Sequence, residues 1–284
     1  MFTLKVENKS GQVLKLTQDE SNYQVINIEG LNPPKANINT SPVAMMDGQK
    51  FKSARLEIRN IVLTIKVNGN AEENRLHLYE YFATGKLCKI YYKNDSRNVF
   101  IEGYCETIEC PLFTMNQQMQ VSIICPDPYL KSLLAIYSDI SKEYAAFEFP
   151  FDIEEEGIEF ACLDPDRETT VMNGGEIESG LKITLTARSG NVAYPIIYDV
   201  DTNEFLKLNA VLQEGDVVII TTNKGNKTIK KISNAVETNI INSLEAGSTW
   251  FQLKVGVNRF TYTATYNDNG LKVEFESNLL YEGV

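Results

Sequence analysis

The clearest pattern in the first half of the chain is an alternation of apolar and polar residues that changes phase. Apolar side chains lie at even positions at Leu56 and Ile58 and then at odd positions from Ile61 to Val67. A strand has a period of two, so the change of parity predicts an extra residue, in a bulge or sharp bend near Asn60. One interpretation is a long extended segment, residues 47–65, that serves two sheets or leaves one to meet a partner. The other is a single core strand with one irregular residue.

Further alternating segments predict a β-rich first half with one helix. The predicted strands cover residues 2–6, 13–16, 23–28, 87–93, 99–108 and 118–125. Between residues 30 and 47 the composition is rich in Asn, Thr, Ser and Pro, which predicts an extended loop and a contact element.

The helix is predicted over Ala71–Thr84, because two glutamates lie in its first turn and Gly85 follows its end. Its expected apolar stripe consists of Leu76, Tyr79, Phe82 and Ala83. His77 falls one position off that stripe, which favours a half-exposed bystander over a catalytic base.

The second half reads as a run of short strands with turn signals about every ten residues, which is typical of a β-sandwich. The predicted strands cover residues 181–188, 195–200, 205–208, 217–221, 228–232, 250–255, 259–266 and 271–275. We therefore expect a mainly β protein with a β-barrel-like N-terminal domain that contains one α-helix, followed by a jelly-roll sandwich. The expected division is 1–130, a connection at 131–150 with a short amphipathic piece around 130–140, and 151–284.

Trp250 is the candidate contact residue of the second half. Phe251, Leu253 and Val255 alternate as the expected core set, which places Trp250 on the opposite face with Gln252 and Lys254. An outward Trp could stack on a sugar ring or anchor a partner protein. The alternative is a Trp at a sheet edge, covered by a neighbouring loop.

Charge separates the two halves of the chain. Residues 1–130 carry 14 Lys and Arg and 14 Asp and Glu, whereas residues 131–284 carry 13 and 24, so the whole net charge of −11 lies in the second half. A neutral half can pack against copies of itself without repulsion, and an acidic half suits a solvated outer position. Neither half has the positive face expected of a nucleic-acid binder.

Candidate chemistry is sparse. The five cysteines form no CxxC pair, which predicts buried free thiols made in a reducing compartment, with neither a metal nor a cofactor. The carboxylates of Asp152 and Glu154–Glu156 could be a calcium site or, with Asp164 and Asp166, a glycosidase pair, but the EF-hand spacing is absent and a solvated loop is favoured. No apolar run has the length of a membrane span, and the first residues show no signal peptide.

An ordered set of short segments resembles the distal tail proteins of siphophages that infect Gram-positive bacteria. The set comprises residues 30–34, 47–55, 59–63, 75–82, 101–106, 123–129, 173–175, 215–216, 253–258 and 281–283. No single segment is specific, but their order is, and they cover nearly the whole chain.

The resemblance implies a structural hub and not an enzyme. The N-terminal domain would close into a hexameric ring below the tail tube protein, and the galectin-like C-terminal domain would project outward to carry receptor-binding or accessory proteins. The ring would also meet the tail-associated or tail-fibre protein. Such a protein would lie at the virion tail tip or baseplate and be made in the host bacterial cytoplasm. The alternative function is a carbohydrate-binding module that attaches to the host cell wall through Trp250.

Overall fold

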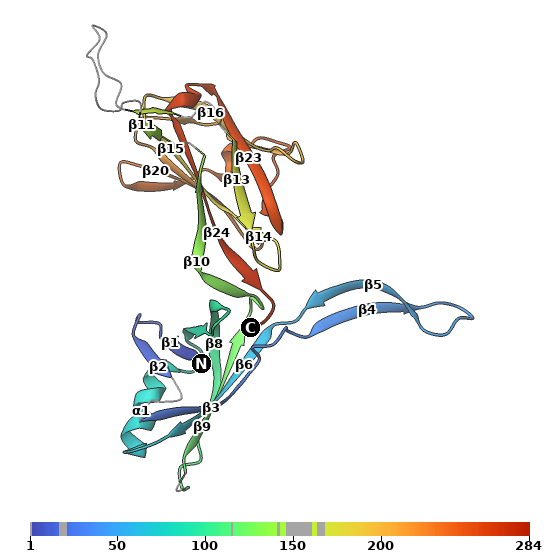
Figure 1. The fold of residues 1–284 in the computed structure, drawn as a ribbon, viewed down its shortest axis with the longest axis vertical. Coiled ribbons are helices and arrows are strands. Elements are labelled where there is room, and N and C mark those ends of the chain that lie inside the picture. The colour runs from blue at the N-terminus through green and yellow to red at the C-terminus, as the bar shows by residue number, and fades with distance from the viewer. Residues whose placement is uncertain (1, 17–21, 115, 141–142, 146–160, 164–167) are drawn as a thin grey trace. The chain divides into compact units, whose positions relative to one another are not determined.

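The structure is a computed structural model that describes residues 2–16, 22–114, 116–140, 143–145, 161–163 and 168–284. The described residues are mostly β-strand, arranged in antiparallel sheets with one α-helix, as predicted (Figure 1). They form two compact units, Met1–Leu134 with Leu280–Val284, and Ala135–Leu279. The finer division at residues 130 and 150 stays a prediction.

The first unit is built on a curled antiparallel sheet. Its strand order is β2-β1-β7-β8-β9-β6-β3, and the start of β10 pairs with β8. The strands are β1 (Thr3–Glu7), β2 (Val13–Leu16), β3 (Tyr23–Glu29), β6 (Arg59–Val67), β7 (Leu87–Lys93), β8 (Asn98–Glu109), β9 (Gln118–Cys125) and β10 (Leu130–Asp139). The predicted alternation in β9 is confirmed, because Met119, Val121, Ile123 and Cys125 are all buried.

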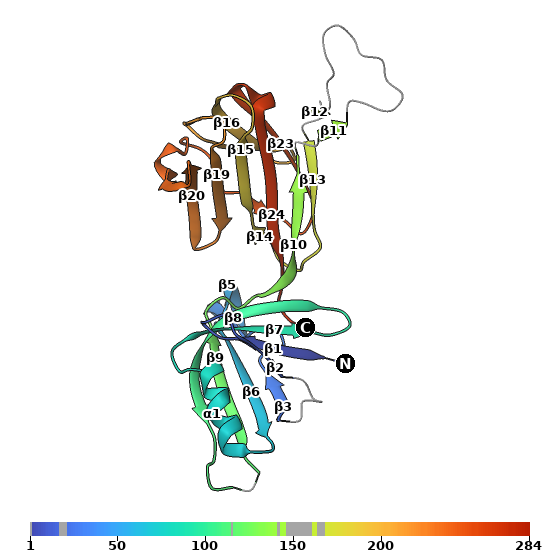
Figure 2. The same ribbon diagram turned by 90° about the vertical axis from the view of Figure 1, so that its left-hand side faces the viewer.

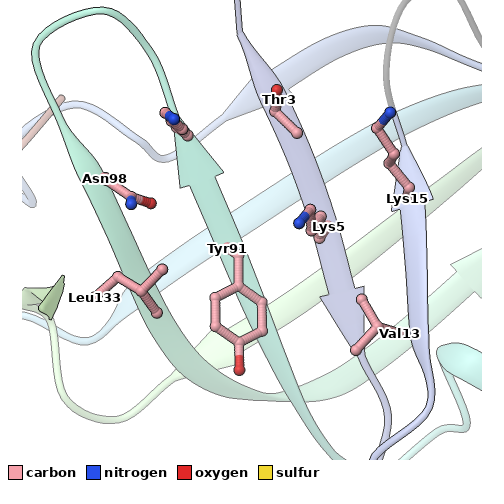
Figure 3. A pocket seen from close by; sticks show the side chains of 8 residues that line it. Thr3, Lys5, Val13, Lys15, Tyr91, Asn98 and Leu133 are labelled. Atoms are coloured by element: carbon pink, nitrogen blue, oxygen red, sulfur yellow. The ribbon is translucent and has the colours of Figure 1, made fainter.

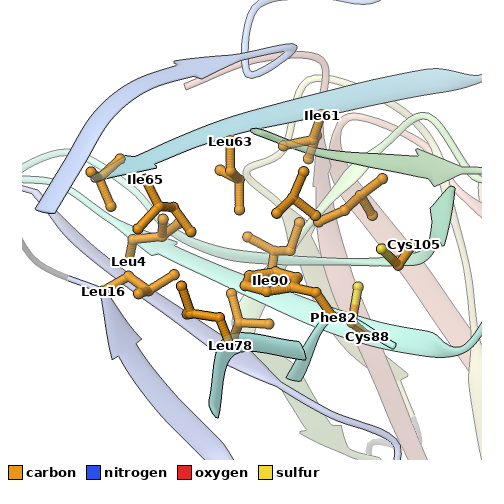
Figure 4. Close-up of a cluster of buried hydrophobic side chains, with 14 of the residues drawn as sticks. Leu4, Leu16, Ile61, Leu63, Ile65, Leu78, Phe82, Cys88, Ile90 and Cys105 are labelled. Carbon is orange, nitrogen blue, oxygen red and sulfur yellow. The ribbon is translucent and has the colours of Figure 1, made fainter. Parts of the chain in front are cut away.

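The helix α1 (Ala71–Tyr81) packs on this sheet through Leu78, and Phe82 lies just beyond its end (Figure 4). Both side chains are fully buried in the core with Leu4, Leu63 and Ile90. The predicted stripe was wrong at Leu76, which is 53% exposed. Leu78 takes its place because the helix turns the side that carries Leu78 and Phe82, four residues apart, toward the strands.

A separate hairpin leaves this sheet between β3 and β6. It consists of β4 (Ala36–Pro42) and β5 (Gln49–Leu56), which form a two-stranded sheet of their own. The predicted loop at 30–47 was wrong over β4, because the β5 backbone satisfies its hydrogen bonds in spite of the Asn-Thr-Ser composition. The irregularity predicted near Asn60 lies instead at Glu57 and Ile58, between β5 and β6. The extended segment 47–65 does serve two sheets, because β5 belongs to the hairpin and β6 to the curled sheet.

The second unit is a sandwich of two antiparallel sheets (Figure 2). The strands of one sheet follow the order β24-β15-β19-β20-β21. The strands of the other follow the order β13-β23-β16-β17, and β18 also pairs with β16. The strands are β13 (Glu168–Asn173), β15 (Lys182–Ala187), β16 (Val192–Asp199), β17 (Phe205–Lys207), β18 (Val211–Leu212), β19 (Val217–Asn223), β20 (Asn226–Ser233), β21 (Val236–Asn239), β23 (Gly256–Tyr266) and β24 (Leu271–Tyr281), with the short pairs β11 (Glu143–Ala145) and β12 (Ala161–Leu163), and β14 (Ser179–Gly180) and β22 (Gln252–Leu253).

Aromatic rings fill the sandwich core. Phe260 stacks on Phe275 at a centroid distance of 4.9 Å and lies 5.7 Å from Phe251. Strands β13 and β21 were not predicted, and the amphipathic piece at 130–140 is strand β10. The threonines, asparagines and serines of these three strands interrupt the alternation of apolar and polar residues, so the sequence shows no clear period of two there.

Candidate assembly interface

The hairpin β4–β5 is the most exposed element of the first unit. Figure 1 shows it extending away from the strands of the curled sheet, and its backbone pairs only within the hairpin. Its apolar side chains lie open to solvent, with exposures of 59% for Ile38, 61% for Phe51, 106% for Met45 and 70% for Met46. A soluble monomer seldom leaves so many large apolar side chains on one thin element.

The register gathers part of this apolar surface on one side of the hairpin. Ile38 lies opposite Ala54, and Thr40 lies opposite Phe51 after a register shift beyond Asn39. Residues 38 and 40 of one strand share a face, so Ile38 and Phe51 also share it. On the other face Asn39 donates to Ser53 Oγ at 3.0 Å. A two-stranded hairpin alone is only marginally stable in water, so this arm gains stability if another surface covers its apolar side.

Arg59 fixes the base of the arm. It is 2% exposed, and its guanidinium donates to the backbone oxygens of Gly30 at 2.5 Å, Asn32 at 2.8 Å, Pro128 at 2.7 Å and Glu282 at 2.6 Å. Burial lowers the pKa of Arg59, and the charges of Cys125 and Glu282 oppose that shift. One side chain thereby joins the start of the arm, the end of β9 and residue 282.

Gly30 makes the close approach at this base possible. It has φ +84°, and a Cβ added there would lie 2.0 Å from the Asn60 carbonyl oxygen. Nearby, the Val284 N–H donates to Leu31 O at 3.3 Å. The arm therefore leaves a rigid junction and not a free linker.

A second exposed apolar tip lies between β8 and β9. Phe113 is 101% exposed and Leu112 is 49% exposed. The Gln117 side chain donates to Leu112 O at 3.1 Å, and Thr114 donates to Pro111 O at 3.1 Å, so local hydrogen bonds order the loop that presents them. Phe113 was not among the predicted contact residues, although a Phe inside a proline-started turn between two strands was a usable signal.

His77 serves the packing of helix α1 on β3. Its Nδ1 lies 2.7 Å from the Tyr23 hydroxyl, and its ring meets Tyr81 edge-on at 5.2 Å. Burial, followed by the charges of Tyr81, Glu73 and Glu80, raises the pKa of Tyr23. His77 is half-buried, as expected for a residue at the border of the apolar stripe.

Three thiols of the first unit lie in its core and are poor nucleophiles. Burial raises the pKa of Cys88 to about 12, of Cys105 to about 11 and of Cys125 to about 12. These three and Cys110 are free thiols; the three are buried, as predicted, whereas Cys110 is only half-buried.

Trp250 is half-buried beside the sandwich core, and the Lys227 ammonium group lies 5.5 Å from its ring centroid. Of the expected core set, Phe251 and Leu253 are buried, but the prediction was wrong for Val255, whose side chain is 54% exposed. The alternation ends there because β22 stops at Leu253 and Gly256 takes φ +95°. A contact of Trp250 with a partner or a sugar stays a prediction.

The acidic candidates Asp152, Glu154–Glu156, Asp164 and Asp166 lie outside the described residues. Within the part of the chain that is described, His, Cys, Asp and Glu side chains form no group of three or more that could hold a metal. The same residues contain no helix long and apolar enough to cross a membrane.

Comparison with known proteins points to phage tails. Residues 174–278 match the family described as "Siphovirus-type tail component, C-terminal domain". No curated protein sequence matches the chain.

Solved structures extend the likeness to the whole fold. The Dit protein of phage SPP1, described as a hub of the adsorption apparatus in phages that infect Gram-positive bacteria, has a TM-score of 0.69 at 14% identity, over 98% of this chain and 99% of that one. Chains of the phage p2 baseplate in its activated conformation, with Ca or Sr, have TM-scores of 0.59 and 0.58 at 10% identity, over 100% of both chains. At these identities the likeness shows a Dit-like fold.

Proposed function

We propose that this chain, whose residues 174–278 match the C-terminal domain of siphovirus-type tail components, is a structural hub of a phage tail tip. Copies of its first unit close into a hexameric ring. The function is mechanical, with no reaction catalysed. The observation that carries the proposal is the hairpin β4–β5, an arm that pairs only with itself and exposes Ile38, Phe51, Met45 and Met46.

The arm suits a contact between neighbouring copies of the chain. A heterologous contact, in which the arm of one copy covers a different surface of the next, closes into a ring when the rotation fits. Burial of the exposed apolar side chains supplies the driving force, at about 25 cal/mol per Å². The first 130 residues have equal numbers of basic and acidic side chains, so neighbouring copies in the ring do not repel one another through net charge.

The second unit takes the outer position and carries other proteins. Its sequence contributes the whole net charge of −11, which favours a solvated place away from the ring contacts. Receptor-binding or accessory proteins would dock there, while the ring would meet the tail tube on one side and the tail-associated protein on the other. On this proposal the protein is made in the host cytoplasm and lies at the virion tail tip.

The test is the assembly state of the full chain, measured by native mass spectrometry and negative-stain microscopy over a range of concentrations. The wild type is expected to give closed rings of six copies. The double variant Ile38→Asp/Phe51→Asp should remain monomeric, because two carboxylates on the arm would have to be buried at the contact.

The matched control is Val236→Asp, which changes an apolar side chain that is 61% exposed on β21 of the second unit. It should form the same rings as the wild type. A wild type that stays monomeric at all concentrations, or rings that survive the double substitution, would contradict the proposal.

A further inference from the structure

The outer face of the first unit carries a basic groove that the arm does not use (Figure 3). It has a volume of about 480 Å³ and crosses the strands β2, β1 and β7. Lys5, Lys15 and Lys93 line it together with Val13, Tyr91 and Leu133. The sequence places these residues outward, because Leu4 and Val6 on the alternate positions of β1 are buried.

The strand register brings the three ammonium groups together. Lys5 lies directly opposite Lys15, and Lys93 lies opposite Thr3, two residues along the same face of β1. Like charges directly opposite each other in an antiparallel pair destabilise a sheet. Among the described residues, none of the three lysines has an ion pair. Glu7, the next acidic residue on this face of β1, instead accepts a hydrogen bond from Tyr91 Oη at 2.5 Å.

The groove also has apolar walls. Val13 is 53% exposed and Leu133 is 43% exposed, and the Tyr91 ring lies between the strands that carry them. A bare inorganic anion would satisfy the lysines but would leave this apolar surface in water. A ligand that carries both carboxylates and an apolar side chain fits the groove as a whole.

We propose that this groove binds an acidic peptide segment of a partner protein, with carboxylates on Lys5, Lys15 and Lys93 and an apolar side chain against Val13 and Leu133. The spacing agrees with an extended peptide. Diagonal neighbours across two strands, such as Lys5 and Lys93, have Cα atoms about 7–8 Å apart, and alternate residues of a strand lie about 7 Å apart. The groove and the arm β4–β5 are different elements, so ring formation and peptide binding can fail independently.

The experiment is fluorescence anisotropy with the full chain and a labelled heptapeptide of six glutamates around a central leucine. We expect saturable binding at low ionic strength that weakens when salt is raised to 150 mM, because the contacts are charged and exposed. The double variant Lys5→Gln/Lys15→Gln should bind at least 10-fold more weakly. It should melt at the same temperature or higher, since it removes a like-charge pair. The control Lys9→Gln/Lys86→Gln, which removes the same charge outside the groove, should bind as the wild type does.

Companion measurements identify the ligand chemistry. A peptide with glutamine for every glutamate should not bind, and one with serine for the central leucine should bind several-fold more weakly. The proposal is overturned by no binding of the acidic peptide, by equal affinity in the lysine variant, or by equal binding of the serine peptide. It is equally overturned if inorganic phosphate displaces the peptide at matched concentration. Failure of the Lys5→Gln/Lys15→Gln variant to form rings would also overturn it, because the groove would then bind a second copy of this chain.

Discussion

The Arg59 guanidinium donates to the backbone carbonyl of Glu282 at 2.6 Å, across 223 residues of sequence. The same side chain holds the carbonyls of Gly30, Asn32 and Pro128. Residue 282 is thus part of the first unit, at the base of the arm that we propose to join neighbouring copies.

Substitution of Arg59 by methionine should destabilise the first unit by about 3 kcal/mol or more, because it leaves several buried carbonyls without a donor. Hydrogen exchange measured by mass spectrometry should show faster exchange of the amides around residues 30–34 and 280–284. Arg55→Met on the exposed arm is the control and should leave this exchange unchanged. Equal protection in Arg59→Met would show that the four hydrogen bonds do not hold the junction.

Gly30→Ala should be much more damaging than Gly48→Ala. Both glycines have positive φ, which costs an L-residue about 1–2 kcal/mol, but only at Gly30 would the new Cβ lie 2.0 Å from Asn60 O. At Gly48, in the arm's turn, no atom lies within 4 Å of that position. Thermal unfolding followed by circular dichroism should show a large loss for Gly30→Ala alone, and equal losses in the two variants would rule out the steric argument.

Alkaline pH should weaken the first unit through its buried thiols. The pKa values of Cys88, Cys105 and Cys125 rise from 9.0 to between about 11 and about 12, so their stabilising contribution is complete below pH 9. It is lost as the pH rises toward the folded-state values, because only the unfolded chain releases these protons. Between pH 9 and 11 the three thiols together should lower the free energy of unfolding by roughly 2–4 kcal/mol per pH unit, least steeply near pH 9, where the unfolded thiols are only half ionised.

The Cys88→Ala variant isolates this effect. Its urea-unfolding stability should fall less steeply with pH than that of the wild type, by about 1.4 kcal/mol per pH unit. A constant difference between the two proteins at every pH would mean that the lost thiol contributes packing only.

Two neighbouring lysines of β20 should differ in their contribution to the second unit. Lys231 Nζ lies 2.6 Å from Asp216, whose side chain is 3% exposed, whereas Lys230 pairs with Glu237 at the open surface. Burial alone would raise the pKa of Asp216, but hydrogen bonds from Lys231, Ser233 and the Gln213 N–H outweigh it and lower the pKa. The stability from this carboxylate is therefore present above its unfolded pKa and is lost as the pH falls through the lower, folded-state value.

Lys231→Met should cost about 2–4 kcal/mol, since it leaves a buried charge without its partner, and Lys230→Met should cost less than about 1 kcal/mol. The half-buried Trp250, the chain's one tryptophan, provides a fluorescence signal for unfolding of this unit. Similar losses in both variants would contradict the distinction.

The fold could be predicted where apolar residues alternate without interruption. The strand 118–125 followed from parity alone, because it packs one face on the core. The change of parity indicated an irregularity near Asn60, close to the observed break at Glu57 and Ile58, and a change of sheet was one of its two interpretations. Strand β4 could not be predicted, since all its side chains are partly or fully exposed and its partner strand β5, not a core, holds it. The stripe of α1 was misplaced because Leu76 and Leu78 are equally apolar and only the packing of the strands decides between them.

The site was anticipated only in outline. Arg59 was not predicted to be buried, although it has the same parity as Ile61, Leu63 and Ile65. No local pattern could name its acceptors, which lie 27 to 223 residues away. The lysine groove needed the register of three strands, β2, β1 and β7, which a sequence with no partner assignment does not contain.

The link from Arg59 to Glu282 bears on the order of events at the ribosome. At about 5–20 residues per second, the 223 intervening residues take roughly 10–45 s to translate, so the nascent chain exposes its arm long before the last acceptor exists. Folding of residues 135–279 is thereby enclosed within that of the first unit. The complete set of hydrogen bonds at the base of the arm can therefore form only once residue 282 has been synthesised.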